Sequence, residues 1–133
     1  MTNTHHEKGD ITKVQSGVIL HQVNVFGIMG AGVARSLADT FPNLEGPYKV
    51  HCKRFGVTGN NTWLNLRGEV QFAPVGQDLM VANLFSQRPL EHKYGVLTDY
   101  EALRKCLRRI QLSVSSESEI HIPERMSKRC AAR

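Results

Sequence analysis

The chain has 133 residues, a formal net charge of +5 and a hydrophobic fraction of 41%. This length suits one domain with its own core, and the hydrophobic fraction excludes an intrinsically disordered chain. No apolar stretch approaches the length of a membrane span and no signal peptide precedes the first predicted strand, so we expect a cytoplasmic protein. The positive charge favours polyanionic partners, both nucleotides and nucleic acids.

The cysteines have neither the even number of a disulfide framework nor the spacing of metal ligands. Cys52, Cys106 and Cys130 are therefore predicted to be reduced thiols, as in a cytosolic protein. No cluster of His, Asp or Glu has ligand spacing either, so the sequence predicts no metal site and no cofactor.

The most informative stretch is residues 17–41. Residues 17–24 are mostly apolar and β-branched, which predicts a strand covered on both faces. The apolar spacing of residues 33–41 predicts a helix, which Pro42 ends. Between them lies a glycine-rich turn with Gly27, Gly30 and Gly32. A glycine turn that opens a helix points backbone N–H groups at its surroundings and favours an anion, although a plain connecting turn is the simpler alternative.

Polar residues interrupt the predicted strand near its end, at His21, Gln22 and Asn24. Polar side chains at the carboxyl end of a central parallel strand face the crevice in which α/β proteins bind ligands. The alternative for each residue is a satisfied hydrogen bond inside the fold. The glycine spacing matches neither the Rossmann fingerprint nor a Walker A loop.

The remaining elements follow in order. Before residue 17 we predict a short edge strand at 4–8 and a turn at 9–12 that Asp10 caps. After residue 42 we predict a helix at 43–55, a loop at 56–61, strands at 62–66, 69–75 and 78–85, and a loop at 88–95. A helix at 98–114 begins with a Thr98–Glu101 capping box, and a strand at 118–123 follows.

The order of these motifs resembles the start of a macrodomain, the ADP-ribose-binding module, and is nearest to the branch of the yeast-type ADP-ribose-1''-phosphate phosphatases. The segments that carry the resemblance are residues 9–12, 21–24, 30–34, 41–42, 48–56 and 83–87, with the helix after Thr98. It implies an α/β fold of three layers, α/β/α, around a mixed sheet over residues 1–123.

The family pattern continues with a second glycine-rich loop, but no glycine occurs after Gly95. We therefore expect a fold that is shortened at its C-terminal end and an atypical tail at residues 124–133. Such a shortening would leave apolar surface open, which predicts self-association through the C-terminal side or marginal stability.

The resemblance implies roles for individual residues. Asp10 accepts a hydrogen bond from the adenine amino group, and the backbone of Ile11 donates to the ring. Asn24 contacts the distal ribose, and His21 lies near the terminal phosphate as general base or general acid. The diphosphate and its neighbourhood are assigned to Met29, Gly30, Ala31, Gly32 and Val33.

The segment 83–87 lines the pocket near the distal ribose in the resembled family, which assigns ligand contacts to Leu84, Phe85, Ser86 and Gln87. A related branch that removes ADP-ribose from modified proteins has a nucleophilic lysine in this region. The present chain has Ser86 and Gln87 there, which argues against a covalent mechanism based on lysine.

Three functions stay open from the sequence. The chain binds ADP-ribose or a derivative and hydrolyses ADP-ribose-1''-phosphate, or it is a non-catalytic ADP-ribose reader. The alternative from another class is a basic nucleic-acid-binding protein that uses residues 104–109, although no aromatic residues are interleaved there for base stacking.

Overall fold

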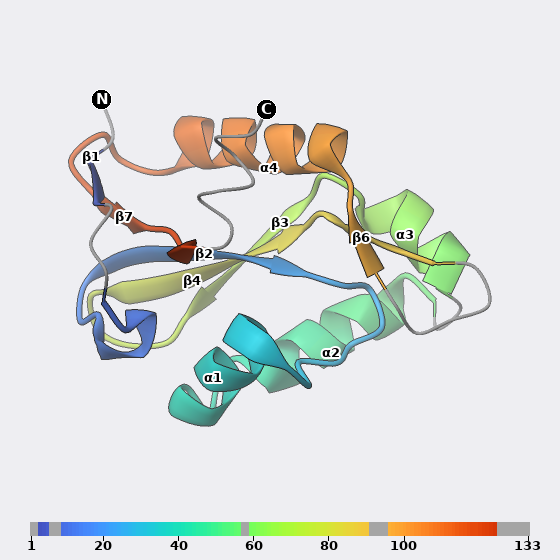
Figure 1. Cartoon of the computed structure of the whole chain (residues 1–133), viewed down its shortest axis with the longest axis horizontal. Coiled ribbons are helices and arrows are strands. Elements are labelled where there is room, and N and C mark those ends of the chain that lie inside the picture. The colour runs from blue at the N-terminus through green and yellow to red at the C-terminus, as the bar shows by residue number, and fades with distance from the viewer. Residues whose placement is uncertain (1–2, 6–8, 57–58, 91–95, 125–133) are drawn as a thin grey trace.

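The computed structural model describes residues 3–5, 9–56, 59–90 and 96–124, without the side chains of 3–5 and 59–61. Within this part of the chain, five strands form a mixed sheet in the order β1-β7-β2-β4-β3. They are β1 (Asn3–His5), β2 (Gly17–Val23), β3 (Val70–Pro74), β4 (Leu79–Phe85) and β7 (Glu119–His121). Helices cover both faces of the sheet (Figure 1), so the predicted three-layer α/β/α fold is confirmed.

The two central strands, β2 and β4, pair in parallel and are buried on both faces. Side chains alternate between the faces of a strand, so odd-numbered and even-numbered residues enter different cores. Ile19, Val23, Val81 and Phe85 pack with the helices α1 (Gly32–Thr40), α2 (Glu45–Arg54) and α3 (Gly59–Leu66). Val18, Leu20, Ala82 and Leu84 pack with α4 (Tyr100–Ser113) on the other face.

Most predicted elements are present within a few residues of their predicted bounds. This holds for the strands predicted at 17–24, 69–75, 78–85 and 118–123 and for the helices predicted at 33–41, 43–55 and 98–114. β1 lies at an edge of the sheet, as predicted, while residues 6–8 of that prediction lie outside the described residues. Residues 125–133 of the tail predicted at 124–133 also lie outside them.

The strand predicted at residues 62–66 is wrong, because these residues form the end of α3. Thr62, Trp63 and Leu66 are buried whereas Leu64 is 68% exposed. This burial pattern is that of one helix face. Threonine and tryptophan favour strands in general, but packing against the α1–α2 side of the sheet overrides that preference here.

The loop predicted at residues 88–95 is wrong at its start. β5 (Gln87–Pro89) pairs in antiparallel fashion with β6 (Val96–Thr98) and forms a separate two-stranded sheet in the described part of the chain. Residues 91–95 of the prediction lie outside the described residues. β5 directly follows β4, so this small sheet extends the carboxyl end of the main sheet beside α3 (Figure 1).

The predicted capping box at the start of α4 is wrong. Asp99 is the N-cap, with extended backbone angles, and its side chain accepts a hydrogen bond from the backbone N–H of Ala102. The donor and acceptor are 3.0 Å apart. Thr98 belongs to β6 instead. An aspartate one residue later satisfies the same unpaired N–H groups, because both side chains cap helices well.

Candidate functional site

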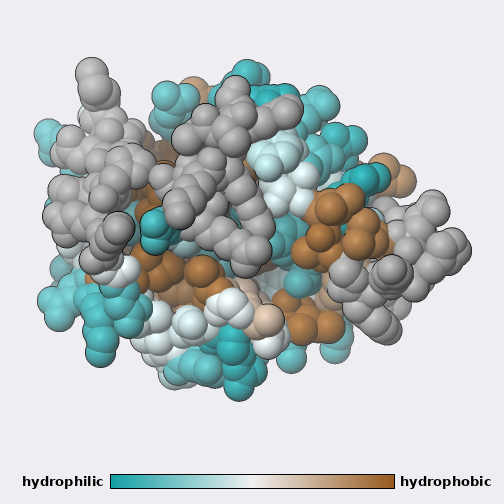
Figure 2. Space-filling model, in the orientation of Figure 1, coloured by the Kyte–Doolittle hydropathy of each residue, from teal (hydrophilic) through white to brown (hydrophobic). Residues whose placement is uncertain are grey.

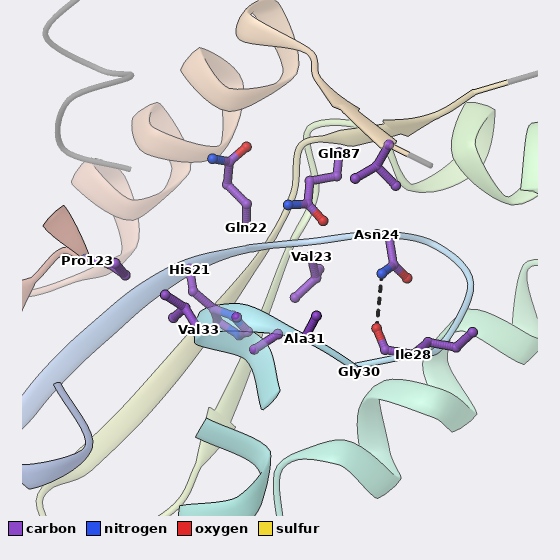
Figure 3. Close-up of a pocket in the computed structure, with 13 residues that line it drawn as sticks. His21, Gln22, Val23, Asn24, Ile28, Gly30, Ala31, Val33, Gln87 and Pro123 are labelled. Carbon is purple, nitrogen blue, oxygen red and sulfur yellow. Dashed lines mark hydrogen bonds between the residues drawn. The ribbon is translucent and has the colours of Figure 1, made fainter. Parts of the chain in front are cut away.

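A cleft of about 410 Å³ lies where β2 ends and α1 begins (Figure 3). The predicted site residues that line it are His21, Asn24, Gly30, Ala31, Gly32, Val33 and Gln87. Gln22, Val96 and Pro123 also line it and lie outside the predicted set. Gln22 has a sequence signal, a polar residue inside an apolar run, whereas Val96 and Pro123 have none.

The start of α1 forms one wall of the cleft. Its N-cap, Ala31, is extended and provides no side-chain hydrogen bond to the first turn. Gly32 follows with φ of +61°, a left-handed conformation that other residues rarely adopt. The N–H groups of the first turn have no intrahelical acceptor and carry the positive end of the helix dipole. This wall can therefore bind an anion through the backbone.

Asn24 organises the loop that leads into this wall. Its Oδ1 accepts hydrogen bonds from the backbone N–H of Phe26 at 2.9 Å and from the hydroxyl of Tyr48 at 2.7 Å. Its Nδ2 donates to the carbonyl of Ile28 at 2.9 Å (Figure 3). Asn24 therefore forms hydrogen bonds inside the fold, which was the alternative interpretation of this residue from the sequence. It nevertheless also lines the cleft.

Met29 is also among the predicted site residues. Its side chain is 1% exposed and belongs to the core under α1 and α2, so it does not line the cleft. Its backbone N–H donates to the carboxylate of Glu45 over 3.4 Å. Met29 therefore anchors the loop to the core of the protein.

His21 lies at the buried side of the cleft and is only 1% exposed. Its Nε2 is 2.6 Å from Oδ1 of Asn83. Burial lowers the pKa of His21 to about 4, against an opposing effect of the Asn83 hydrogen bond. The imidazole is therefore neutral at pH 7. Among the described lining residues it is the one with an ionisable side chain.

The segment 84–87 contributes one side chain to the cleft. Leu84 and Phe85 are fully buried in opposite cores of the sheet. Ser86 is also fully buried, and its hydroxyl donates to Oε1 of Gln22 at 3.0 Å. Gln87 is half-buried and points into the cleft (Figure 3). Ser86 therefore fixes the orientation of Gln22 and does not itself line the cleft.

Asp10 and Ile11 lie in a neighbouring hollow. Asp10 is exposed and caps the short helix η1 (Ile11–Lys13). The Oδ1 atom of Asp10 accepts two hydrogen bonds from Thr12, one from its hydroxyl at 2.6 Å and one from its backbone N–H at 2.9 Å. These bonds lower the pKa of Asp10. Ile11 packs against the same core as Val33 in the first turn of α1.

The hollow and the cleft adjoin at the end of β7. Ile122 lines the hollow at Asp10, and the next residue, Pro123, lines the cleft at the start of α1. The two features predicted to bind opposite ends of one ligand therefore lie on the same side of the molecule.

A metal site, a membrane span and a nucleic-acid-binding helix face find less support in the described residues. Among the described residues, no group of three or more His, Cys, Asp and Glu side chains is placed to hold a metal ion. None of the described helices is long and apolar enough to span a membrane. The basic side chains of α4 lie on its exposed face, on the side of the sheet opposite α1, and Arg109 pairs with Glu69 at 2.7 Å.

No family model matches the chain. The chain is 40% identical over 58 residues to an ADP-ribose 1''-phosphate phosphatase of Candida glabrata, a match that covers 42% of this chain and 32% of the relative. It is 31% identical over 90 residues to an ADP-ribose 1''-phosphate phosphatase of Saccharomyces cerevisiae, covering 65% of this chain and 47% of the relative. The matches therefore span less than half the length of these curated relatives.

Solved structures match a larger share of the chain. A protein of unknown function from Bacteroides thetaiotaomicron superposes with a TM-score of 0.69 at 28% identity, over 92% of this chain and 77% of that one. A macrodomain protein from Streptomyces coelicolor superposes with a TM-score of 0.65 at 25% identity, over 92% and 76%. Thermosipho africanus DarTG in complex with ADP-ribose has the same fold, with a TM-score of 0.64 at 14% identity over 92% and 42%. The chain therefore has the fold of these macrodomains, and over part of its length its sequence is similar to ADP-ribose 1''-phosphate phosphatases.

Proposed function

We propose that the chain binds ADP-ribose, and that ADP-ribose-1''-phosphate is its candidate substrate. The observation that supports this most directly is the uncapped glycine-rich start of α1, which opens into a cleft beside the Asp10 turn. A ligand with a diphosphate between an amino-purine and a sugar matches this order of features. The two phosphatase relatives add the same substrate class.

The proposed ligand lies along the side of the molecule that α1 and η1 share. Its adenine amino group donates to the carboxylate of Asp10, which only accepts hydrogen bonds when ionised. Its diphosphate accepts hydrogen bonds from the N–H groups of residues 30–33. Its terminal ribose then lies near Asn24, His21 and Gln87.

His21 is the proposed catalytic residue. An imidazole that is neutral at pH 7 accepts a proton from an attacking water, so we assign it as general base rather than general acid. The other possibility within this family is a reader that binds ADP-ribose without hydrolysing its phosphate ester.

Calorimetric titration with ADP-ribose tests the binding function. We expect micromolar affinity that Asp10→Ala abolishes, because the adenine amino group then loses its acceptor. Asp78→Ala is the matched control, since Asp78 is an exposed aspartate outside both the cleft and the hollow at Asp10. Absence of ADP-ribose binding, together with salt-steep binding to oligonucleotides, would instead support the nucleic-acid function.

Phosphate release from ADP-ribose-1''-phosphate separates an enzyme from a reader. We expect His21→Ala to lower turnover by at least about 100-fold, the usual contribution of a general base. Its ADP-ribose affinity is expected to fall by no more than about tenfold. Unchanged turnover would remove His21 from the mechanism.

A cytoplasmic location is part of the proposal. Within the described part of the chain, Cys52 and Cys106 are buried and form no disulfide. Burial raises the pKa of Cys52 to about 11 and that of Cys106 to about 12, which keeps both thiols protonated and poorly reactive. Reduced cysteines of this kind are typical of a reducing compartment.

A further inference from the structure

Three polar side chains lie in a row across adjacent strands, on the face of the sheet that carries α1 and α2. In strand register, His21 of β2 is opposite Asn83 of β4, and Asn83 is opposite Gln71 of β3. His21 Nε2 is 2.6 Å from Asn83 Oδ1, and Asn83 Nδ2 donates to Gln71 Oε1 at 3.1 Å. Gln71 Nε2 in turn donates to the carbonyl of Pro47 at 3.3 Å. We call His21, Asn83 and Gln71 the polar row.

The carbonyl of Pro47 sets the direction of every hydrogen bond in the polar row. A backbone carbonyl only accepts, so Gln71 must turn its NH₂ group toward it and its oxygen toward Asn83. Asn83 must then turn its NH₂ group toward Gln71 and its oxygen toward His21. A carboxamide oxygen cannot donate, so the proton of the neutral imidazole is on Nε2.

This leaves Nδ1 of His21 as a bare acceptor. It is buried and has no hydrogen-bond partner among the residues that the structure describes. The ring lies against the start of α1 at the buried side of the cleft (Figure 3). A buried acceptor without a hydrogen bond costs free energy, and a hydrogen-bond donor placed beside it removes that cost. A hydroxyl group or a water molecule is such a donor, whereas the oxygens of a fully ionised phosphate only accept.

We propose that the polar row holds His21 as the Nε2–H tautomer, so that Nδ1 is its accepting nitrogen: it accepts a hydrogen bond from a hydroxyl of the terminal sugar in the ADP-ribose complex, and from the attacking water in the complex with the phosphate ester. Asn83 and Gln71 are positioning residues for this contact. The inference rests on the proposed function, because ADP-ribose supplies the sugar hydroxyl. Nδ1 is covered in the free protein, so we expect ligand binding to shift residues 30–33 slightly.

The tautomer is measured by two-dimensional ¹⁵N NMR of the histidine rings in the full chain without ligand. The His21 signals are assigned by their loss in His21→Gln. We expect a protonated Nε2 and an unprotonated Nδ1 at pH 7. A protonated Nδ1, or an imidazolium at pH 7, would overturn the inference whatever the chain binds.

Two substitutions at Gln71 test the role of the polar row. The carboxylate introduced by Gln71→Glu still accepts from Asn83, so the tautomer is expected to persist. Gln71→Leu removes that acceptor, so Asn83 is free to rotate and we expect a mixture of tautomers with about tenfold weaker ADP-ribose binding. Thr62→Val is the control, since it removes a buried hydrogen bond to Gly56 outside the cleft. Wild-type tautomer and affinity in Gln71→Leu would show that the row does not position His21.

Ligand titration tests the hydroxyl contact. Adding ADP-ribose is expected to move the Nδ1 resonance in the direction of hydrogen-bond acceptance, whereas ADP, which lacks the terminal ribose, leaves it unchanged. Binding by calorimetry without a change at Nδ1 would overturn the role of His21 alone. No binding by calorimetry would remove the proposed function and the sugar hydroxyl with it, while the tautomer measured in the free protein would stand on its own.

Discussion

Individual glycines of this chain are required for different physical reasons. Gly17 and Gly32 both have a left-handed backbone, with φ of +101° and +61°. A side chain at Gly32 would meet no atom within 4 Å, so only its backbone conformation requires glycine. At Gly17 a Cβ would lie 2.5 Å from the carbonyl oxygen of Glu119, so β7 approaches β2 as closely as it does only because residue 17 has no side chain.

We predict that Gly17→Ala destabilises the fold by on the order of 2 kcal/mol or more, because both strain and a backbone clash oppose it. The measurement is urea unfolding followed by circular dichroism. Gly46→Ala is the matched control: Gly46 lies in the first turn of α2 with open space around it, and the change should stabilise by about 0.5 kcal/mol. Equal stability of both variants would contradict the close approach of β7.

At the scale of elements, α4 shows how one residue sets a boundary. The helix carries Leu103, Cys106 and Ile110 into the core on its side of the sheet. It begins directly after β6, where Asp99 caps it and lies 3.8 Å from the guanidinium of Arg67. The cap therefore connects the small β5–β6 sheet, the end of α3 and the start of α4.

We predict that Asp99→Ala lowers the free energy of unfolding by about 1 kcal/mol, the usual cost of losing an N-cap. Asp99→Asn is the conservative control, since its side-chain oxygen still accepts from Ala102. Chemical unfolding of the two variants provides the comparison. If Asp99→Asn lost as much stability as Asp99→Ala, the cap would not be the source of the effect.

At the scale of the whole molecule, pH acts through the buried His21 and the partly buried His51. The pKa of His21 is about 4 in the folded chain and about 6.5 when unfolded. Between these two values the unfolded state binds more protons than the folded state. The contribution of His21 to the free energy of unfolding is therefore fully present above pH 6.5 and is lost as the pH drops toward 4. Burial lowers the pKa of His51 too, which acts in the same direction.

We predict that the wild type loses up to about 3 kcal/mol of stability through His21 between pH 6.5 and 4, the free energy that corresponds to this difference in pKa. Urea unfolding at a series of pH values measures it. The loss should be smaller in His21→Gln and should persist in His51→Gln. Parallel curves for the wild type and His21→Gln would contradict a neutral buried His21.

The molecule also exposes apolar side chains. Ile28 beside the cleft is 50% exposed, Leu97 of β6 is 49% exposed and Leu64 of α3 is 68% exposed. Figure 2 shows apolar surface over β6 on the side of the molecule that faces the viewer. Such surface is consistent with contacts between copies of the chain.

The self-association that we predict for the C-terminal side stays a prediction, and sedimentation over a range of concentrations tests it. We expect a concentration-dependent dimer or larger species. Leu97→Lys and Leu64→Lys test whether β6 or α3 takes part, with the exposed Leu112→Lys on α4 as control. A monodisperse monomer with a high melting temperature would contradict the prediction.

Patterns that act within one segment were enough to predict β2, β4, α1, α2 and α4, because the direction of apolar side chains repeats with the period of a strand or a helix. They also placed the glycine turn before α1 and the cap at Asp10. The direction of a strand side chain relative to a cleft depends instead on register with partner strands. Tertiary structure alone therefore decided that Gln87 reaches the cleft while Ser86 does not, and that His21 meets Asn83 from 62 residues away. It also decided that residues 62–66 pack as a helix, because their burial comes from distant parts of the chain.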